Sequence, residues 1–132
     1  MELEALVDQT LSRGFPLSED SMQALVQLFP PSVVAIALES GLSKGVVCIT
    51  STPSGRVAHE FSFCGTRTTL VLLPKRLYCS CESFVEMLVN STSVTESFMC
   101  KHLLAAKIAI AANAVVHEKV KDADFSNRIL NA

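Results

Sequence analysis

The fold of this chain is decided by two short stretches, Tyr78-Cys79-Ser80-Cys81 and Cys100-Lys101-His102, with 18 residues between Cys81 and Cys100. Zinc prefers thiolate and imidazole ligands, and three thiolates with one imidazole close a tetrahedral structural site. Residues two apart in an extended segment point to the same side, so Cys79 and Cys81 can approach one metal together. Cys100 falls at the predicted start of a helix, where free N–H groups stabilise a thiolate. The spacing predicts one structural zinc ion held by Cys79, Cys81, Cys100 and His102.

Two other interpretations of these four residues stay open at this point. One takes them as three small buried hydrophobic residues beside a core histidine. The other takes two of the cysteines as a redox pair. Thiol exchange usually needs an exposed thiol of lowered pKa without a histidine ligand beside it, so the spacing favours zinc.

The remaining cysteines and histidines lie outside this pattern. The chain has five cysteines, an odd number that does not indicate a disulfide framework. Cys48 and Cys64 stand in strand-like runs and are interpreted as small buried hydrophobic residues. His59 is predicted to be a strand residue. His117 is predicted to end a helix, where a cation suits the helix dipole.

Apolar residues at helical spacing predict three helices in the first third of the chain, over residues 2–12, 18–29 and 32–40. Ser18 is the expected N-cap of the second helix. The third helix has Pro31 at its start and Gly41 just past its end, the usual asymmetry of helix termini.

The next third of the chain has strand character. Short β-branched and alternating runs predict strands over residues 46–50, 57–63 and 68–73. The first two runs flank Thr52-Pro53-Ser54-Gly55, which is typical turn chemistry and predicts a hairpin. We expect the three strands to form an antiparallel meander.

The last third is predicted to be helical again. Ser83 and Glu86 have the spacing of a capping box, and the polar stretch 90–97 is predicted to be a loop. A long helix is expected over 98–116 and a short one within 118–132. The predicted fold is α+β, with N-terminal helices and a three-stranded meander that zinc ties to a long C-terminal helix.

The 132 residues are expected to form a single domain. It consists of a helical segment (1–41), a zinc-binding region (45–117) and a C-terminal helix (118–132). Apolar residues make up 49% of the chain and the net charge is −2, which excludes disorder and a global basic field. The longest nearly apolar run, 103–116, is too short for a membrane span. The acidic start, Met1-Glu2-Leu3-Glu4, predicts an intracellular chain without a signal peptide.

The mean hydropathy of +0.38 is high for a chain whose whole surface faces water. Apolar residues in the predicted helix over 98–116 occupy more than one of its faces. Two interpretations stay open, a core helix packed on all sides or a helix that also binds a partner.

No pattern of an enzyme is present. The chain lacks a phosphate-binding Gly-x-x-x-x-Gly-Lys-Ser/Thr loop, a Gly-x-Ser-x-Gly elbow and a His-Glu-x-x-His helix. A zinc ion with four protein ligands has no open position for a reacting water. We expect no enzymatic activity, no catalytic residue and no small-molecule substrate.

Three stretches carry a resemblance to a known family: Ser51 to Arg56, Tyr78 to Phe84 and Met99 to Ala105. The arrangement Cys-x-Cys, then Cys-x-His, is similar to the SWIM-type zinc finger. Together with the short length and the helical N-terminal segment, it resembles the small SWIM-domain subunits of Shu complexes. The resemblance implies that Cys79, Cys81, Cys100 and His102 are the zinc ligands.

The resemblance also implies a function. Such subunits are nuclear and form an obligate heterodimer with a RecA-like paralogue of the strand-exchange recombinase. The pair promotes recombinase filament assembly on single-stranded DNA in homologous recombination, DNA repair and meiosis. Single-stranded or branched DNA is then a partner through the complex, and a membrane is not.

An alternative is a stand-alone nucleic-acid-binding zinc module. In this hypothesis several cations converge near the metal and an aromatic ring stacks on a base. The residues concerned are Arg67, Lys75, Arg76 and Lys101, with Tyr78 or Phe84 as the ring.

Overall fold

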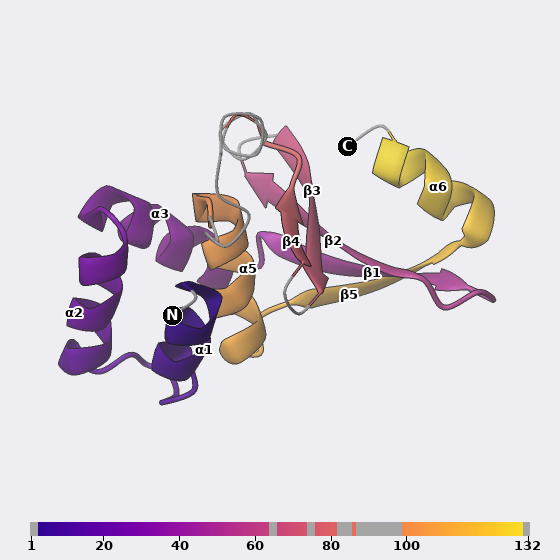
Figure 1. The fold of residues 1–132 in the computed structure, drawn as a ribbon. Helices are drawn as coiled ribbons and strands as arrows, with labels where there is room; N and C mark the ends of the chain where they lie inside the picture. The colour runs from indigo at the N-terminus through magenta and orange to yellow at the C-terminus, as the bar shows by residue number, and fades with distance from the viewer. Residues whose placement is uncertain (1–2, 64–65, 74–75, 82–85, 87–98, 131–132) are drawn as a thin grey trace.

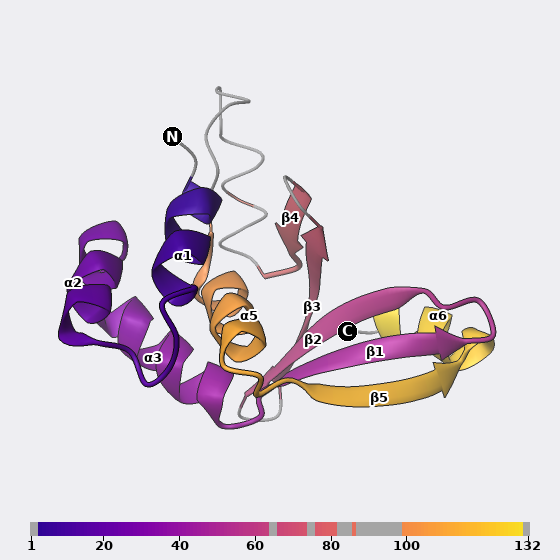
Figure 2. The same ribbon diagram turned by 90° about the horizontal axis from the view of Figure 1, so that it is seen from below.

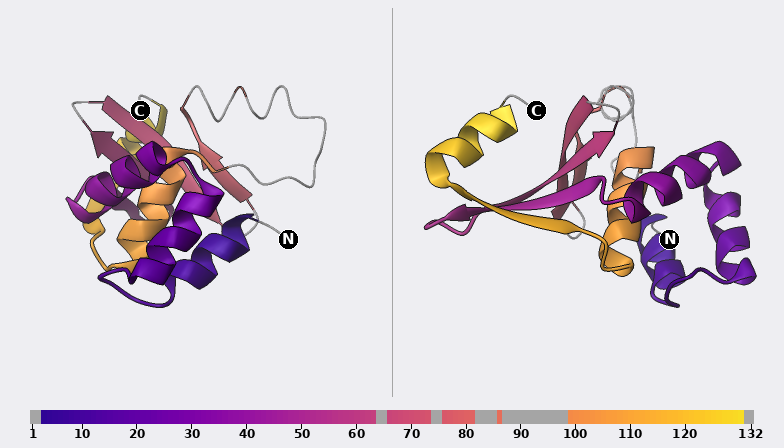
Figure 3. Two further views of the ribbon diagram at one scale, coloured as in Figure 1. Left: turned by 90° about the vertical axis from the view of Figure 1, so that its left-hand side faces the viewer. Right: turned by 180° about the vertical axis from the view of Figure 1, so that it is seen from behind.

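The computed structural model describes residues 3–63, 66–73, 76–81, 86 and 99–130. It has the predicted α+β architecture, with a group of helices at one end and a sheet that extends away from them (Figure 1). The helices of this end are α1 (Leu3–Leu11), α2 (Glu19–Leu28), α3 (Pro31–Leu42) and α5 (Lys101–Ala111). A further helix, α6 (Asp122–Leu130), lies over the far end of the sheet, opposite α1, α2 and α3 (Figure 3).

The sheet has five strands in the order β4-β3-β2-β1-β5. Consecutive strands from β1 to β4 pair antiparallel, whereas β5 pairs parallel with β1. The prediction of only three antiparallel strands is therefore wrong, because β4 and β5 extend the sheet at its two edges. The strands are β1 (Val46–Thr52), β2 (Val57–Phe63), β3 (Thr66–Leu73), β4 (Arg76–Cys79) and β5 (Val116–Lys121).

The termini of the first helices follow from local chemistry. Ser18 caps α2 as predicted, since its hydroxyl accepts a hydrogen bond from the Ser21 N–H at 3.2 Å. Pro31 is the first residue of α3. The prediction that Gly41 lies beyond this helix is wrong, because α3 continues to Leu42.

Gly41 stays helical because it faces α5 at very short range. A Cβ atom at this position would lie 2.7 Å from the carbonyl oxygen of Ala105 and 3.2 Å from the Cγ2 atom of Ile108. The backbones of α3 and α5 can approach this closely only without a side chain at position 41.

The substitution Gly41→Ala is expected to destabilise the protein by about 1–3 kcal/mol, because the added methyl group overpacks a contact made by backbone atoms. The direction of the change in stability is informative, because alanine in place of glycine normally stabilises a helix by about 1 kcal/mol. Urea unfolding measures the change. Glu39→Ala, at an exposed position of the same helix, is the matched control and should stay close to the wild type. A Gly41→Ala variant of increased stability would contradict the close packing.

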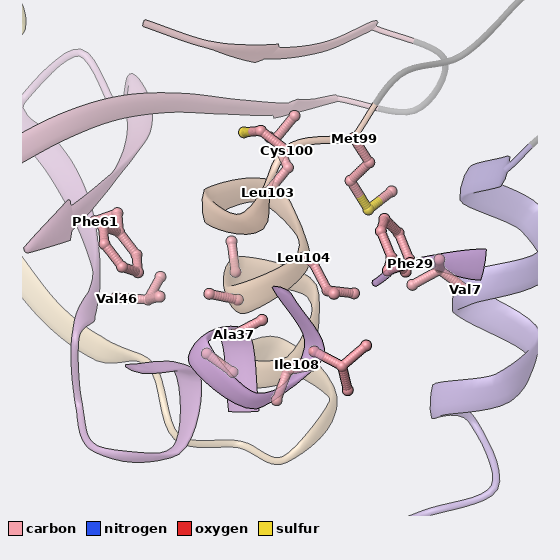
Figure 4. Close-up of a cluster of buried hydrophobic side chains, with 14 of the residues drawn as sticks. Val7, Phe29, Ala37, Val46, Phe61, Met99, Cys100, Leu103, Leu104 and Ile108 are labelled. Atoms are coloured by element: carbon pink, nitrogen blue, oxygen red, sulfur yellow. The ribbon is translucent and has the colours of Figure 1, made fainter. Parts of the chain in front are cut away.

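The core lies between α5, the surrounding helices and the near end of the sheet (Figure 4). In α5, six of eleven residues are buried, and Val46 and Phe61 of the sheet pack against this helix. The structure thus supports a core helix, although Ile110 remains 49% exposed. The six buried residues are Leu103, Leu104, Ala105, Ala106, Ile108 and Ala109.

The helix predicted over 98–116 is shorter than expected. Asn113 adopts a left-handed conformation, φ 56°, and the N–H of Ala114 donates to the carbonyl of Ala109 at 2.8 Å. This hydrogen-bonding pattern ends α5 and lets the chain leave as strand β5. His117 consequently lies in β5 and not at a helix terminus. For the same reason the last helix begins at Asp122 instead of residue 118.

The helix predicted to begin at Ser83, the loop predicted over 90–97 and the position of Cys64 lie outside the described residues. Among the helices that the structure describes, none has the length and apolar character needed to cross a membrane.

Helix α6 is fastened to one face of the sheet by polar contacts. The Oδ1 atom of Asp122 accepts hydrogen bonds from the Ser54 hydroxyl at 2.8 Å and the Ser54 N–H at 3.3 Å, and these bonds lower the pKa of Asp122. Arg128 pairs with Glu60 at 2.6 Å and with Glu118 at 2.8 Å. The ring of Phe125 is buried, and α6 thereby covers the far end of the sheet.

Candidate metal centre

The four predicted zinc ligands lie together at the junction between the sheet and the helices. Cys79 is the last residue of β4, and Cys81 follows it by two positions. Cys100 is the N-cap of α5, and His102 lies in the first turn of that helix. Their ligand atoms are all within 4.8 Å of one another, and no second such cluster occurs within the described part of the chain.

The donor set fits one zinc ion. The Sγ atom of Cys100 is 3.8 Å from the Nδ1 atom of His102. Zinc–sulfur and zinc–nitrogen bonds of about 2.3 and 2.1 Å place the donors of a tetrahedral site about 3.5–3.8 Å apart. Three sulfur atoms and one nitrogen atom also form the closed set that structural zinc prefers.

The charge state of the cluster suits a metal ion. The hydrogen bond with Cys79, helped by His102 and the Leu103 N–H, lowers the pKa of Cys100. The same hydrogen bond and burial raise the pKa of Cys79. The thiolate form of Cys100, which a metal ion binds, is therefore favoured at the helix terminus. A bound zinc ion would replace the protons of the other thiols, as in structural zinc sites generally.

The neighbours of the cluster hold it in place. Cys79 is fully buried and Cys100 is 6% exposed, so water has little access to these two sulfur atoms. The ring of Phe61 meets the imidazole of His102 edge-on, with ring centroids 4.7 Å apart and an angle of 74°. Figure 4 shows Phe61 facing the start of α5 from the sheet. Nothing in the sequence linked Phe61 with His102, because the contact joins a strand to a distant helix.

Other residues singled out from the sequence lie elsewhere. Cys48 is half-buried on β1, between His59 on β2 and His117 on β5. Of the cations expected near the metal, Lys101 is exposed directly beside Cys100. Arg67 belongs to β3, while Arg76 and Tyr78 belong to β4. Lys75 and Phe84 lie outside the described residues, and the convergence of these groups stays a prediction.

The fold and the site together define a class of protein. It is a small α+β protein with a Cys-x-Cys and Cys-x-His cluster at the junction between the sheet and the helices. No protein-family model matches the chain. The chain is similar to zinc finger SWIM domain-containing protein 7 of Danio rerio, with 29% identity over 121 residues. The similarity covers 92% of this chain and 82% of that protein. It confirms the resemblance to the SWIM-type zinc finger family, and with the cluster it supports the predicted zinc cofactor.

Proposed function

We propose that this chain is a zinc-stabilised adaptor of homologous recombination and DNA repair. It pairs in the nucleus with a RecA-like recombinase paralogue and promotes assembly of recombinase filaments on single-stranded DNA. The carrying observation is the four-residue cluster in a chain similar over most of its length to a SWIM zinc finger protein. The recombination role follows from the resemblance to small SWIM-domain subunits.

The zinc ion has a structural part in this proposal. When bound, it supplies a cross-link between the end of β4 and the start of α5, two elements that lie side by side but are separated by a long connection. All four positions of the tetrahedron are taken by protein ligands, so the site offers no place for a substrate. In this proposal the chain therefore acts through a surface that binds another protein.

The helical end of the molecule is the surface that we assign to the partner. Several large apolar side chains are exposed there, including Val26 on α2, Ile36 on α3 and Ile110 on α5, at 39%, 37% and 49%. Exposed apolar side chains on several helices of one end of the molecule favour contact with another protein. They also account for part of the high mean hydropathy of +0.38.

Purification of the tagged full chain from its own cells tests the pairing. We expect a RecA-like protein to co-purify in about equal amount, and mass spectrometry identifies it. The double variant Val26→Glu and Ile36→Glu is expected to reduce its recovery about tenfold or more, because two carboxylates enter an apolar contact. Ala123→Glu is the control, since Ala123 is exposed on α6, away from the helical end. A chain that stays monomeric in its own extract at high concentration would contradict the proposal.

A further inference from the structure

Strand β5 separates its charges between the two faces of the sheet. Glu118 faces α6, where its carboxylate pairs with Arg128 at 2.8 Å. Side chains alternate between faces along a strand. His117, Lys119 and Lys121 therefore lie on the opposite face, away from α6.

The strand register extends this opposite face over β1 and β2. Cys48 is paired with both His59 and His117, so these three side chains form one row across three strands. In the next row Thr50 is paired with Val57 and Lys119. We call this surface the open face, and it consists of Cys48, Thr50, Thr52, Val57, His59, His117, Lys119 and Lys121.

The open face has no helix over it in the described structure. Helix α5 covers only the near end of this side of the sheet, where Val46 and Phe61 enter the core. Figure 2 shows β2, β1 and β5 towards the viewer, with α6 behind them. His117, Lys119, Lys121 and Val57 are exposed, while His59 and Cys48 are half-buried.

The charge of this surface is opposite to that of the whole chain. The chain has a net charge of −2, yet the residues of β1, β2 and β5 that share the open face include two lysines and no carboxylate. The acidic side chains of β2 and β5, Glu60 and Glu118, lie on the other side of the sheet, where both pair with Arg128. An anionic partner is the one that the open face complements.

We propose that the open face binds single-stranded nucleic acid, with Lys119 and Lys121 at phosphates and the imidazole of His117 under a base. The inference rests on the proposed function, because it assigns the surface with which the chain contacts the DNA strand in that function. A sheet face that combines cations with flat rings matches the two requirements of single-strand binding, a charged path for the backbone and platforms for the bases.

His59 favours a nucleic acid over an acidic peptide as the ligand of the open face. Burial and the neighbouring His117 both lower the pKa of His59, which keeps this imidazole uncharged at neutral pH. An uncharged ring adds nothing to the attraction of a carboxylate, whereas its face can stack on a base. Thr50 and Thr52 lie beside the lysines on the same face, where the Thr52 hydroxyl donates to the Val120 carbonyl at 3.2 Å. Lysine side chains alone would suffice for an acidic peptide.

Fluorescence anisotropy of a labelled oligothymidylate with the full zinc-loaded chain tests the inference. At low ionic strength we expect weak, saturable binding. The double variant Lys119→Glu and Lys121→Glu should weaken it about tenfold or more. It should also reduce the slope of log affinity against log salt by about 1.4, the value for two lost single-strand phosphate contacts. His117→Ala should lose about fivefold or more, because one stacked base is lost.

Matched controls and competitors make the result decisive. Arg13→Glu with Lys44→Glu changes the net charge equally at exposed positions outside the open face, and should bind like the wild type. Each variant must keep its zinc and its thermal unfolding profile. The inference is overturned if the unmodified chain does not bind, if both charge variants weaken binding equally, or if polyglutamate competes better than oligothymidylate.

The outcomes also separate this inference from the proposed function. A chain that recovers its RecA-like partner but binds oligothymidylate unchanged after both lysine substitutions would refute the open face alone. A chain without such a partner whose binding depends on Lys119, Lys121 and His117 would refute the adaptor role and retain the open face.

Discussion

Substitution of Cys79 by serine is expected to abolish zinc binding and to unfold the junction between the sheet and the helices. Metal binding contributes on the order of 10 kcal/mol to the folding of structural zinc sites, which is comparable with the whole stability of a small domain. Cys79 is fully buried, so its loss removes a ligand at the centre of the core. Zinc content by inductively coupled plasma mass spectrometry and thermal unfolding by circular dichroism measure the two effects.

Substitutions at other cysteine and histidine positions serve as controls for the effect of Cys79→Ser. Cys48→Ser alters a half-buried cysteine outside the cluster and should leave one zinc per chain. His102→Ala should behave like Cys79→Ser, because it removes another ligand. Chelation should unfold the wild type in the same way, with recovery when zinc is returned. A soluble, folded double variant of Cys79→Ser and His102→Ala without zinc would disprove the structural role of the metal.

Substitution of Arg128 by methionine is expected to cost about 3–5 kcal/mol, the usual effect of removing one partner from a buried ion pair. The side chain of Glu60 is 2% exposed, and its Oε1 atom is 2.6 Å from a guanidinium nitrogen of Arg128. Without Arg128 the carboxylate is left in the sheet interior without its charged partner. Urea unfolding measures the loss.

A double-mutant cycle separates the burial of charge from the loss of packing. Glu60→Gln together with Arg128→Met removes both charges and should recover part of the stability lost in the single variant. Glu118→Gln is the control on the same arginine, because Glu118 is 45% exposed and a partner in water contributes about 1 kcal/mol or less. Equal losses for Glu118→Gln and Arg128→Met would contradict a special role of the buried pair.

The helix starts, the turn and the metal cluster were predicted correctly from the sequence because each depends on local chemistry. Ser18 and Pro31 mark helix starts through their own hydroxyl group and ring. The turn at residues 52–55 joins two strands because Gly55 accepts a left-handed conformation, φ 74°. The spacing of the four metal ligands depends only on extended and helical geometry, so the cluster could be predicted before the fold was known.

The elements that were missed depend on contacts between distant parts of the chain. Strand β5 has the sequence Val-His-Glu-Lys-Val-Lys. It becomes a strand because it pairs, in parallel orientation, with the edge of β1 that does not pair with β2. Asn113 was a usable signal for the end of α5, since asparagine tolerates the left-handed conformation there. The burial of Glu60 was not predicted from the sequence. Its burial is stabilised by Arg128, which is 68 positions later in the sequence.

The parallel pairing of β1 with β5 has a consequence for the order in which the protein folds. The hairpin of β1 and β2 closes a short loop, whereas Thr52 and Val120 are brought together from positions 68 residues apart. Closing a long loop costs conformational entropy before the contacts between its ends can form, so such non-local pairings slow folding. The hairpin can therefore form early, whereas the packing of α5 against α3, like the pairing of β5 with β1, joins distant parts of the chain. Docking of β5 with α6 is the late step that completes the sheet and, with it, the open face.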